Sequence, residues 1–170
     1  MKVIIAEKPS VAQQIAAVVG ATARKDGYIE GGGYAVTWAF GHLVGPAMPE
    51  AYGIEGFKRE NLPILPETFI LEPRRVKSGK EYKPDPGAVK QLAVLKELFS
   101  RTERIVVATD AGREGELIFR FIYHYLDCKT PFDRLWISSL TERAIREGLA
   151  NIRPGSEYDD LYLSARARCE

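Results

Sequence analysis

Cysteine is scarce in this 170-residue chain, and long apolar runs are missing from it. Cys128 and Cys169 lie far apart and form no CxxC pair, which argues against a disulfide framework or a zinc ribbon. No stretch approaches the about 20 apolar residues of a membrane span. The first ten residues, MKVIIAEKPS, hold too short an apolar run for a signal peptide. These features predict a soluble, cytoplasmic protein without a membrane partner.

The chain also has no excess of charge of one sign. Its 24 lysines and arginines nearly balance its 23 acidic residues, and the formal net charge is +1. Without a global positive field, nucleic-acid binding has to come from local basic clusters. One such cluster comprises Arg74, Arg75, Lys77, Lys80 and Lys83. The composition excludes a disordered or collagen-like chain, and a chain of this length buries its own core. We expect a monomer.

Strand-like and helix-like segments alternate along most of the chain. Val3–Ala6 and Ile105–Ala108 are short apolar runs typical of buried strands, and each leads through a polar turn into residues at helical spacing. Leu135–Ile137 is predicted as a third strand. Ser10, in a capping box with Gln13, and Thr141 are predicted to start two of the helices, and Gly20 is predicted to end the first. The alternation predicts an α/β fold with a central, mostly parallel sheet flanked by helices.

Between about residues 25 and 85 the alternation gives way to β and loop segments, which predicts an excursion from the sheet. Within it, Gly31–Gly33 resembles a phosphate loop only superficially. It matches neither of the two glycine-rich phosphate-binding signatures, GxGxxG and GxxxxGK[ST], and it precedes a strand instead of a helix. A turn is therefore favoured. We expect one domain over residues 1–153, with 154–170 as the start of a following helical domain.

Acidic side chains follow the two apolar strands. Glu7 comes after the first strand and Asp110 after the second, so both face one crevice if the strands are neighbours. Carboxylates this close repel each other unless a cation offsets the repulsion, and hard oxygen ligands suit Mg²⁺. Lys8 and Arg113 add positive charge suited to phosphate. The pattern predicts metal-dependent phosphoryl transfer.

Several of these residues have a structural explanation when taken singly. Glu114 and Glu116 lie at the start of a predicted helix, where acids complement the helix dipole. His42, in the segment FGHL, is by itself typical of a structural histidine. The joint occurrence of EKPS after one strand and TDAGREGE after the next favours a functional site.

The motifs IIAEKPSVAQQIA, VTWAFGHL, NLPILPETF, IVVATDAGREGELIF and LYLSARARCE, in this order, resemble the Toprim domain of type IA DNA topoisomerases, most closely the bacterial topoisomerase III group. Such enzymes break a single DNA strand through a 5′-phosphotyrosine and rejoin it. The resemblance implies a Toprim, Rossmann-like fold, Mg²⁺ as cofactor and single-stranded DNA as partner.

The resemblance also implies roles for individual residues. Glu7 serves as acid/base at the 3′-oxygen, Lys8 stabilises the scissile phosphate, and Glu114 supports the acidic centre. Glu7 and Asp110 hold the metal. The positions expected to contact DNA are Lys8, His42, Arg113, Arg134, Arg166 and Arg168.

Two departures from the family pattern matter. The family motif is Asp-x-Asp-x-Glu, whereas this chain has Gly112 at the position of the second aspartate. Because glycine has no side-chain ligand, we expect one bound metal ion, with Glu114 or Glu116 assisting through water. The nucleophilic tyrosine of the family lies in a later domain, and none of the eight tyrosines here stands in a similar segment. We therefore expect an N-terminal piece that needs the remaining domains in cis and is inactive alone.

Two other classes stay open. A primase-like enzyme or metal-dependent nuclease of the Toprim type uses the same acids without a tyrosine, although EKPS and FGHL fit topoisomerases better. A non-catalytic nucleic-acid-binding module would carry a larger basic excess than +1.

Overall fold

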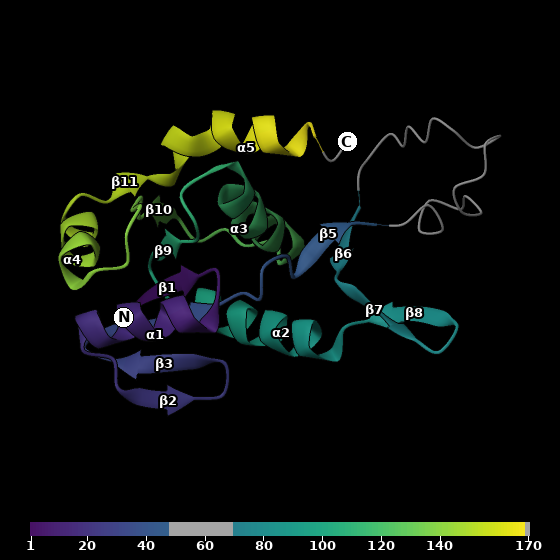
Figure 1. Cartoon of the computed structure of the whole chain (residues 1–170), viewed down its shortest axis with the longest axis horizontal. Helices are drawn as coiled ribbons and strands as arrows, with labels where there is room; N and C mark the ends of the chain where they lie inside the picture. The colour runs from purple at the N-terminus through teal and green to yellow at the C-terminus, as the bar shows by residue number, and fades with distance from the viewer. Residues whose placement is uncertain (48–69, 169–170) are drawn as a thin grey trace.

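The computed structural model describes residues 1–47 and 70–168, so the predicted motif NLPILPETF lies outside the described residues. A seven-stranded sheet runs through the centre in the order β11-β10-β9-β1-β4-β3-β2 (Figure 1). Its strands, in chain order, are β1 (Lys2–Ala6), β2 (Ala23–Lys25), β3 (Tyr28–Gly31), β4 (Tyr34–Trp38), β9 (Ile105–Ala108), β10 (Phe132–Arg134) and β11 (Arg153–Pro154).

The middle of this sheet is parallel. β1 pairs with β4 on one side and with β9 on the other, and β10 continues the parallel order beside β9. The antiparallel strands lie at the edges, where β2 and β3 form a meander with β4, and β11 pairs with β10. The predicted α/β fold with a mostly parallel central sheet is confirmed.

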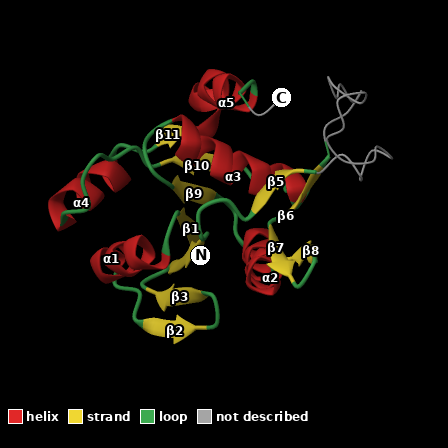
Figure 2. Ribbon diagram, turned by 45° about the vertical axis from the view of Figure 1, so that its right-hand side comes forward, coloured by secondary structure: helices red, strands yellow, loops and turns green. Residues whose placement is uncertain are grey.

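Helices cover both faces of the sheet (Figure 2). The α-helices of the described residues are α1 (Pro9–Val19), α2 (Pro86–Arg101), α3 (Arg113–Tyr125), α4 (Glu142–Ala150) and α5 (Asp159–Arg166), and a 3₁₀ turn, η3 (Gly155–Tyr158), precedes α5. Successive residues of β1 point to opposite faces. Ile5 joins the core under α2, α3 and α5, whereas Ile4 joins the core under α1 and α4. This double burial explains the uninterrupted apolar runs.

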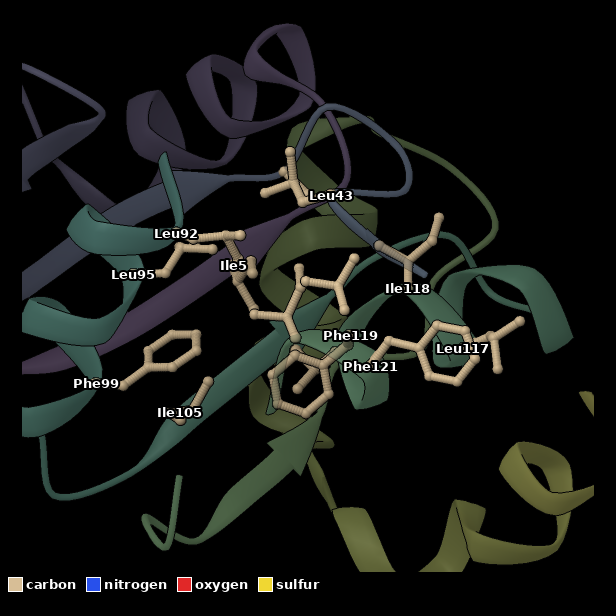
Figure 3. Close-up of a cluster of buried hydrophobic side chains, with 14 of the residues drawn as sticks. Ile5, Leu43, Leu92, Leu95, Phe99, Ile105, Leu117, Ile118, Phe119 and Phe121 are labelled. Atoms are coloured by element: carbon tan, nitrogen blue, oxygen red, sulfur yellow. The ribbon is translucent and has the colours of Figure 1, made fainter. Parts of the chain in front are cut away.

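The core beneath α2 and α3 is rich in large side chains (Figure 3). Phe99 of α2 and Phe119 of α3 meet edge to face, with ring centroids 6.4 Å apart. Leu43, which follows β4 in the chain, is buried in the same cluster. The segment that leads away from the sheet is therefore fixed to the core at its start.

Helix ends agree with the sequence in two of three cases. Gly20 ends α1 with φ 81°, and the Thr141 side chain accepts from Ala144 N at the start of α4, at 3.2 Å. The prediction for α1 is wrong, because the helix begins at Pro9, with Lys8 as the N-cap and no side-chain capping bond. Proline suits the first helical position, since the amide hydrogen that it lacks has no partner there.

The predicted excursion is narrower than expected. β3 and β4 belong to the central sheet, and Gly32 and Gly33, both with positive φ, form the turn between them. Outside the sheet, the described residues form two small antiparallel pairs: β5 (Val44–Pro46) with β6 (Leu71–Pro73), and β7 (Arg75–Ser78) with β8 (Glu81–Pro84).

The third predicted strand is displaced. β10 spans Phe132–Arg134, whereas Leu135–Ile137 was expected. Leu135 and Ile137 are apolar because they pack in the core with α1 and α4 after the strand has ended. No helix among residues 1–47 and 70–168 is long and apolar enough to cross a membrane.

Candidate functional site

The pairing of β1 with β9 brings Glu7 and Asp110 together, one residue and two residues after their strands. Asp110 N lies 3.4 Å from Glu7 Oε1 and donates to it. Glu7 is buried, with 8% of its surface exposed, while Asp110 is exposed. The site therefore combines one desolvated carboxyl group with one that faces solvent.

This position changes the proton affinity of Glu7. Burial raises the pKa of Glu7 above its ordinary value of 4.5, and a side-chain hydrogen bond with Asp110 and the repulsion of that carboxylate raise the pKa further. A backbone hydrogen bond from Asp110 and the charge of Lys8 act in the opposite direction. Glu7 thus keeps a proton more readily than an exposed glutamate does.

The loop after β9 is tightly folded against the start of α3. Thr109 Oγ1 donates to Gly115 O at 2.8 Å, which ties the two ends of the loop. A Cβ at Gly115 would overlap the carbonyl group of Asp110, so only glycine allows this approach. Gly112, the N-cap of α3, has φ 157° and ψ 178°, a combination that is nearly exclusive to glycine. Both glycines of TDAGREGE are therefore explained by the shape of the loop.

The buried side chain of Arg134 fixes this loop through hydrogen bonds. Its Nη1 donates to Val107 O at 3.1 Å and to Thr109 Oγ1 at 2.8 Å, and its Nη2 donates to Asp110 O at 2.7 Å. The side chain is 1% exposed. The sequence predicted that Arg134 contacts DNA; here its guanidinium group contacts the backbone of the residue that supplies a carboxylate to the site.

Glu116 completes a buried charged network. Its carboxylate lies 3.3 Å from Arg134 Nε and accepts from Arg120 Nε at 2.8 Å. Arg120 also donates to Gly155 O and pairs with Asp159 of α5, at 2.9 and 2.8 Å. The expectation that Glu116 assists the metal through water is wrong, because Glu116 is 1% exposed and engaged by two arginines.

Glu114 lies apart from this network. Its exposed carboxylate pairs with His42 Nε2, which joins the start of α3 to the segment after β4. Gly41 N donates to Glu7 O at 3.3 Å in the same segment. Within residues 1–47 and 70–168, no group of three or more His, Cys, Asp or Glu side chains is close enough to share a metal. Within the described part of the chain, Glu7 and Asp110 therefore form a pair of acids without a third.

The remaining predicted residues occupy two regions. Lys8 and Arg113 are exposed, next in sequence to Glu7 and Gly112. Arg166 and Arg168 lie at the end of α5, where the charge of Arg166 helps to lower the pKa of His124, after burial and the charge of Arg120. Arg168 is exposed.

The donor set fits a hydrated Mg²⁺ ion. Asp110 raises the pKa of the neighbouring Glu7, and a hard divalent cation between the two carboxyl groups relieves this repulsion. Two protein ligands leave most of the octahedral shell of Mg²⁺ to water. Gly112 supplies no side-chain ligand.

Comparison with known proteins identifies relatives of the whole chain. A family model of the Toprim domain matches residues 2–140. The DNA topoisomerase 3 proteins of Bacillus cereus (strain ATCC 14579) and Bacillus subtilis (strain 168) are 47% and 46% identical over 99% of this chain, which spans 22% of their length. Full-length topoisomerase I from Thermotoga maritima has a similar structure, with a TM-score of 0.52 and 26% identity over 89% of this chain and 21% of that one.

Replacing Gly115 with alanine tests the loop geometry. We expect Gly115→Ala to lower the free energy of unfolding by roughly 2 kcal/mol or more, because the new methyl group displaces the Asp110 carbonyl. Urea unfolding measures the effect. Gly45→Ala is the control, since a Cβ at Gly45 meets no atom within 4 Å. Equal stability of the two variants would contradict the close approach.

The raised pKa of Glu7 has a consequence for stability. Because the folded-state pKa exceeds the unfolded value, ionisation of Glu7 opposes folding, and its favourable contribution is lost as pH rises above 4.5. Glu7→Gln should therefore melt at a higher temperature than the parent at neutral pH without metal, and at the same temperature well below pH 4.5. Glu103→Gln, an exposed control, should show no such crossover. A destabilised Glu7→Gln protein at neutral pH would refute the argument.

Proposed function

The chain belongs to the Toprim domain family, and from this premise we propose that it is the metal-binding domain of a DNA topoisomerase that breaks and rejoins single DNA strands. One observation carries the proposal. Glu7 and Asp110 meet at the ends of two neighbouring parallel strands, at the crevice where ligands bind in open α/β sheets. The similarity to DNA topoisomerase 3 proteins supports DNA as the substrate.

Glu7 is proposed as the group that moves a proton at the 3′-oxygen of the broken strand. A buried carboxyl group with a raised pKa retains a proton to give to a leaving oxygen and takes one back on resealing. Lys8, exposed and adjacent, is proposed to hold the scissile phosphate. Glu7 and Asp110 would hold Mg²⁺, which supplies charge neutralisation at the phosphate when bound.

The exposed residues near the acidic pair are proposed to position the strand. Lys8 and Arg113 offer phosphate contacts, and Glu114 and His42 form a pair at the mouth of the site. Arg166 and Arg168 are proposed as further DNA contacts at the end of α5. Arg134 is proposed to act indirectly, by fixing the backbone that presents Asp110.

The nucleophilic tyrosine is proposed to come from a part of the protein other than these 170 residues. The relatives are more than four times longer than this chain, which leaves room for a domain that supplies it. The tyrosine would form the 5′-phosphotyrosine and leave the 3′-hydroxyl near Glu7. We propose that the whole protein acts as a monomer in the cytoplasm.

Metal binding tests the proposed role of the acidic pair. We expect weak Mg²⁺ binding in calorimetry, because only two carboxylates contribute and the ion keeps most of its water. Asp110→Asn should lower the affinity at least about tenfold, since one of the two charged ligands is lost. Glu103→Gln, which removes an exposed carboxylate elsewhere, should bind like the parent. Equal binding by Asp110→Asn and the parent would remove Asp110 from the site.

Activity tests the proposed source of the nucleophile. The 170-residue chain, incubated with supercoiled plasmid and Mg²⁺ and quenched with denaturant, should give neither relaxed topoisomers nor a protein–DNA adduct, because no covalent intermediate forms without the tyrosine. A 5′-linked adduct would show that one of its own tyrosines attacks DNA. Strand cleavage without an adduct would favour the metal-dependent nuclease instead.

A further inference from the structure

The hairpin β7–β8 concentrates positive charge outside the acidic site. Residues 75–84 carry four basic side chains and one acidic side chain, Glu81, a net charge of +3. Because the whole chain has a net charge of +1, the other residues together sum to −2. All eight strand residues of the hairpin are exposed, and Figure 1 shows the hairpin at the periphery, beside the start of α2. A local positive field of this kind attracts a polyanion.

The basic residues differ in whether the protein already pairs them. Arg75 forms an ion pair with Glu72, at 3.1 Å. Lys77, Lys80 and Lys83 have no ion-pair partner in the part of the chain that the structure describes. Their charges are therefore available to phosphate groups.

The strand register separates the two faces of the hairpin. Lys77 lies opposite Tyr82, and Arg75 lies opposite Pro84, so these side chains share one face. Lys83 lies opposite Val76 on the other face. Tyr82 is 65% exposed, an unusual position for a large aromatic ring. One face thus presents an exposed ring beside an unpaired lysine.

The Tyr82 face borders a hollow. A space of about 700 Å³ lies between the hairpin and the β5–β6 pair. It is lined by Gly45, Pro46, Glu72, Pro73, Arg74, Arg75, Glu81 and Tyr82. Its volume falls in the range of small-molecule sites, enough for one nucleotide. Two carboxylates line the hollow. The ion pair with Arg75 offsets the charge of Glu72, and Glu81 lies opposite Ser78, on the face of the hairpin away from Tyr82.

The base of the hairpin is rigidly held. Arg74 Nε and Nη2 both donate to Asp85 Oδ2, at 3.1 and 2.6 Å, and Arg74 Nη1 donates to Phe40 O at 3.2 Å. The hydrogen bond with Arg74 lowers the pKa of Asp85, so this carboxylate stays charged. Arg74 therefore has a structural role, because it joins the hairpin to the segment Phe40–His42. In that segment, Gly41 N donates to Glu7 O, and His42 pairs with Glu114.

From these observations we infer that the β7–β8 hairpin is a second binding site for single-stranded DNA. An unstacked base enters the hollow and stacks on Tyr82, while Lys77 and Lys80 pair with the phosphates that flank it. Single-stranded DNA is the partner because only unpaired bases expose a face to an aromatic ring. The inference rests on the proposed function only in taking DNA as the partner, and it needs neither metal nor cleavage.

Binding of the 170-residue chain to labelled oligothymidylate, followed by fluorescence anisotropy at low salt without metal, tests the site. Tyr82→Leu should weaken binding about tenfold, because it removes the stacking surface, whereas Tyr82→Phe should bind like the parent. The Lys77→Gln/Lys80→Gln double variant should lower the slope of log K against log salt by about 1.4, at about 0.7 per phosphate contact. Thermal melts confirm that the variants remain folded.

Lys83→Gln is the matched control within the hairpin, because it removes the same charge from the opposite face. It should weaken binding less than twofold. The single variant Lys77→Gln is measured beside it, and an equal loss of affinity in the two single variants would show a diffuse charge effect and overturn the site. Tighter binding of a duplex than of the single strand, an unaltered affinity in Tyr82→Leu, or no binding at all would also overturn it.

Asp110→Asn separates this inference from the proposed function. It should lower the Mg²⁺ affinity at least about tenfold, as expected above, yet leave oligothymidylate binding without metal within about twofold of the parent, because the hairpin holds the strand without the acidic pair. If Asp110→Asn removed the DNA binding, the contact would belong to the acidic site and the hairpin would have no part in it.

Discussion

The guanidinium group of Arg134 links α3 to two neighbouring strands of the sheet and to the loop that carries Asp110. It donates to Val107 O of β9 and to Asp110 O in the loop after β9, it lies 3.3 Å from Glu116 of α3, and Arg134 itself is the last residue of β10. An arginine buried to this degree loses its hydration, which costs several kcal/mol unless hydrogen bonds and an opposite charge replace the water. Three backbone and hydroxyl oxygens accept from the Nη atoms of Arg134, and the Glu116 carboxylate, 3.3 Å from Nε, supplies the opposite charge without a hydrogen bond to Nε. The geometry of the loop and the charge of the arginine therefore depend on each other.

The network extends from this arginine to α5. Glu116 contacts Arg134 and Arg120, and Arg120 reaches both Gly155 O and Asp159. The rings of Phe132 and Tyr162 lie within 4.7 and 5.3 Å of the Arg120 guanidinium carbon and add cation–π contacts. The segment after residue 154 is thus packed on the domain through the same buried charges that support the acidic pair. The predicted boundary at 153 lies inside β11, so the sheet continues across it.

The features of the fold and the site that could be predicted from the sequence are those that depend on neighbouring residues. Buried strands, the glycine at the end of α1 and the threonine cap of α4 were predicted from neighbouring residues, and the structure confirms them. The meeting of Glu7 and Asp110 followed from topology, because parallel neighbours place their carboxyl ends at one edge. The network of Arg120 and Glu116 is not predicted from the sequence, because its other members are distant in the chain: Gly155 lies 35 residues after Arg120, and Arg134 lies on β10. Charged residues inside the apolar pattern of α3 were the only available sign.

The same distinction explains why Arg134 and Arg74 were assigned to DNA. A basic residue near a predicted site or in a basic cluster has the same appearance in the sequence whether it faces solvent or the protein. The structure shows that Arg134 is buried and that Arg74 pairs with Asp85, and both features depend on non-local contacts. Arg74 gains a role from this pairing. By bonding to Phe40 O it fixes the exposed lysines of the hairpin relative to the segment that contacts Glu7 and Glu114. A DNA strand bound at the hairpin would therefore lie at a fixed distance from the acidic pair, because the segment Phe40–His42 contacts both the hairpin base and the residues of the site.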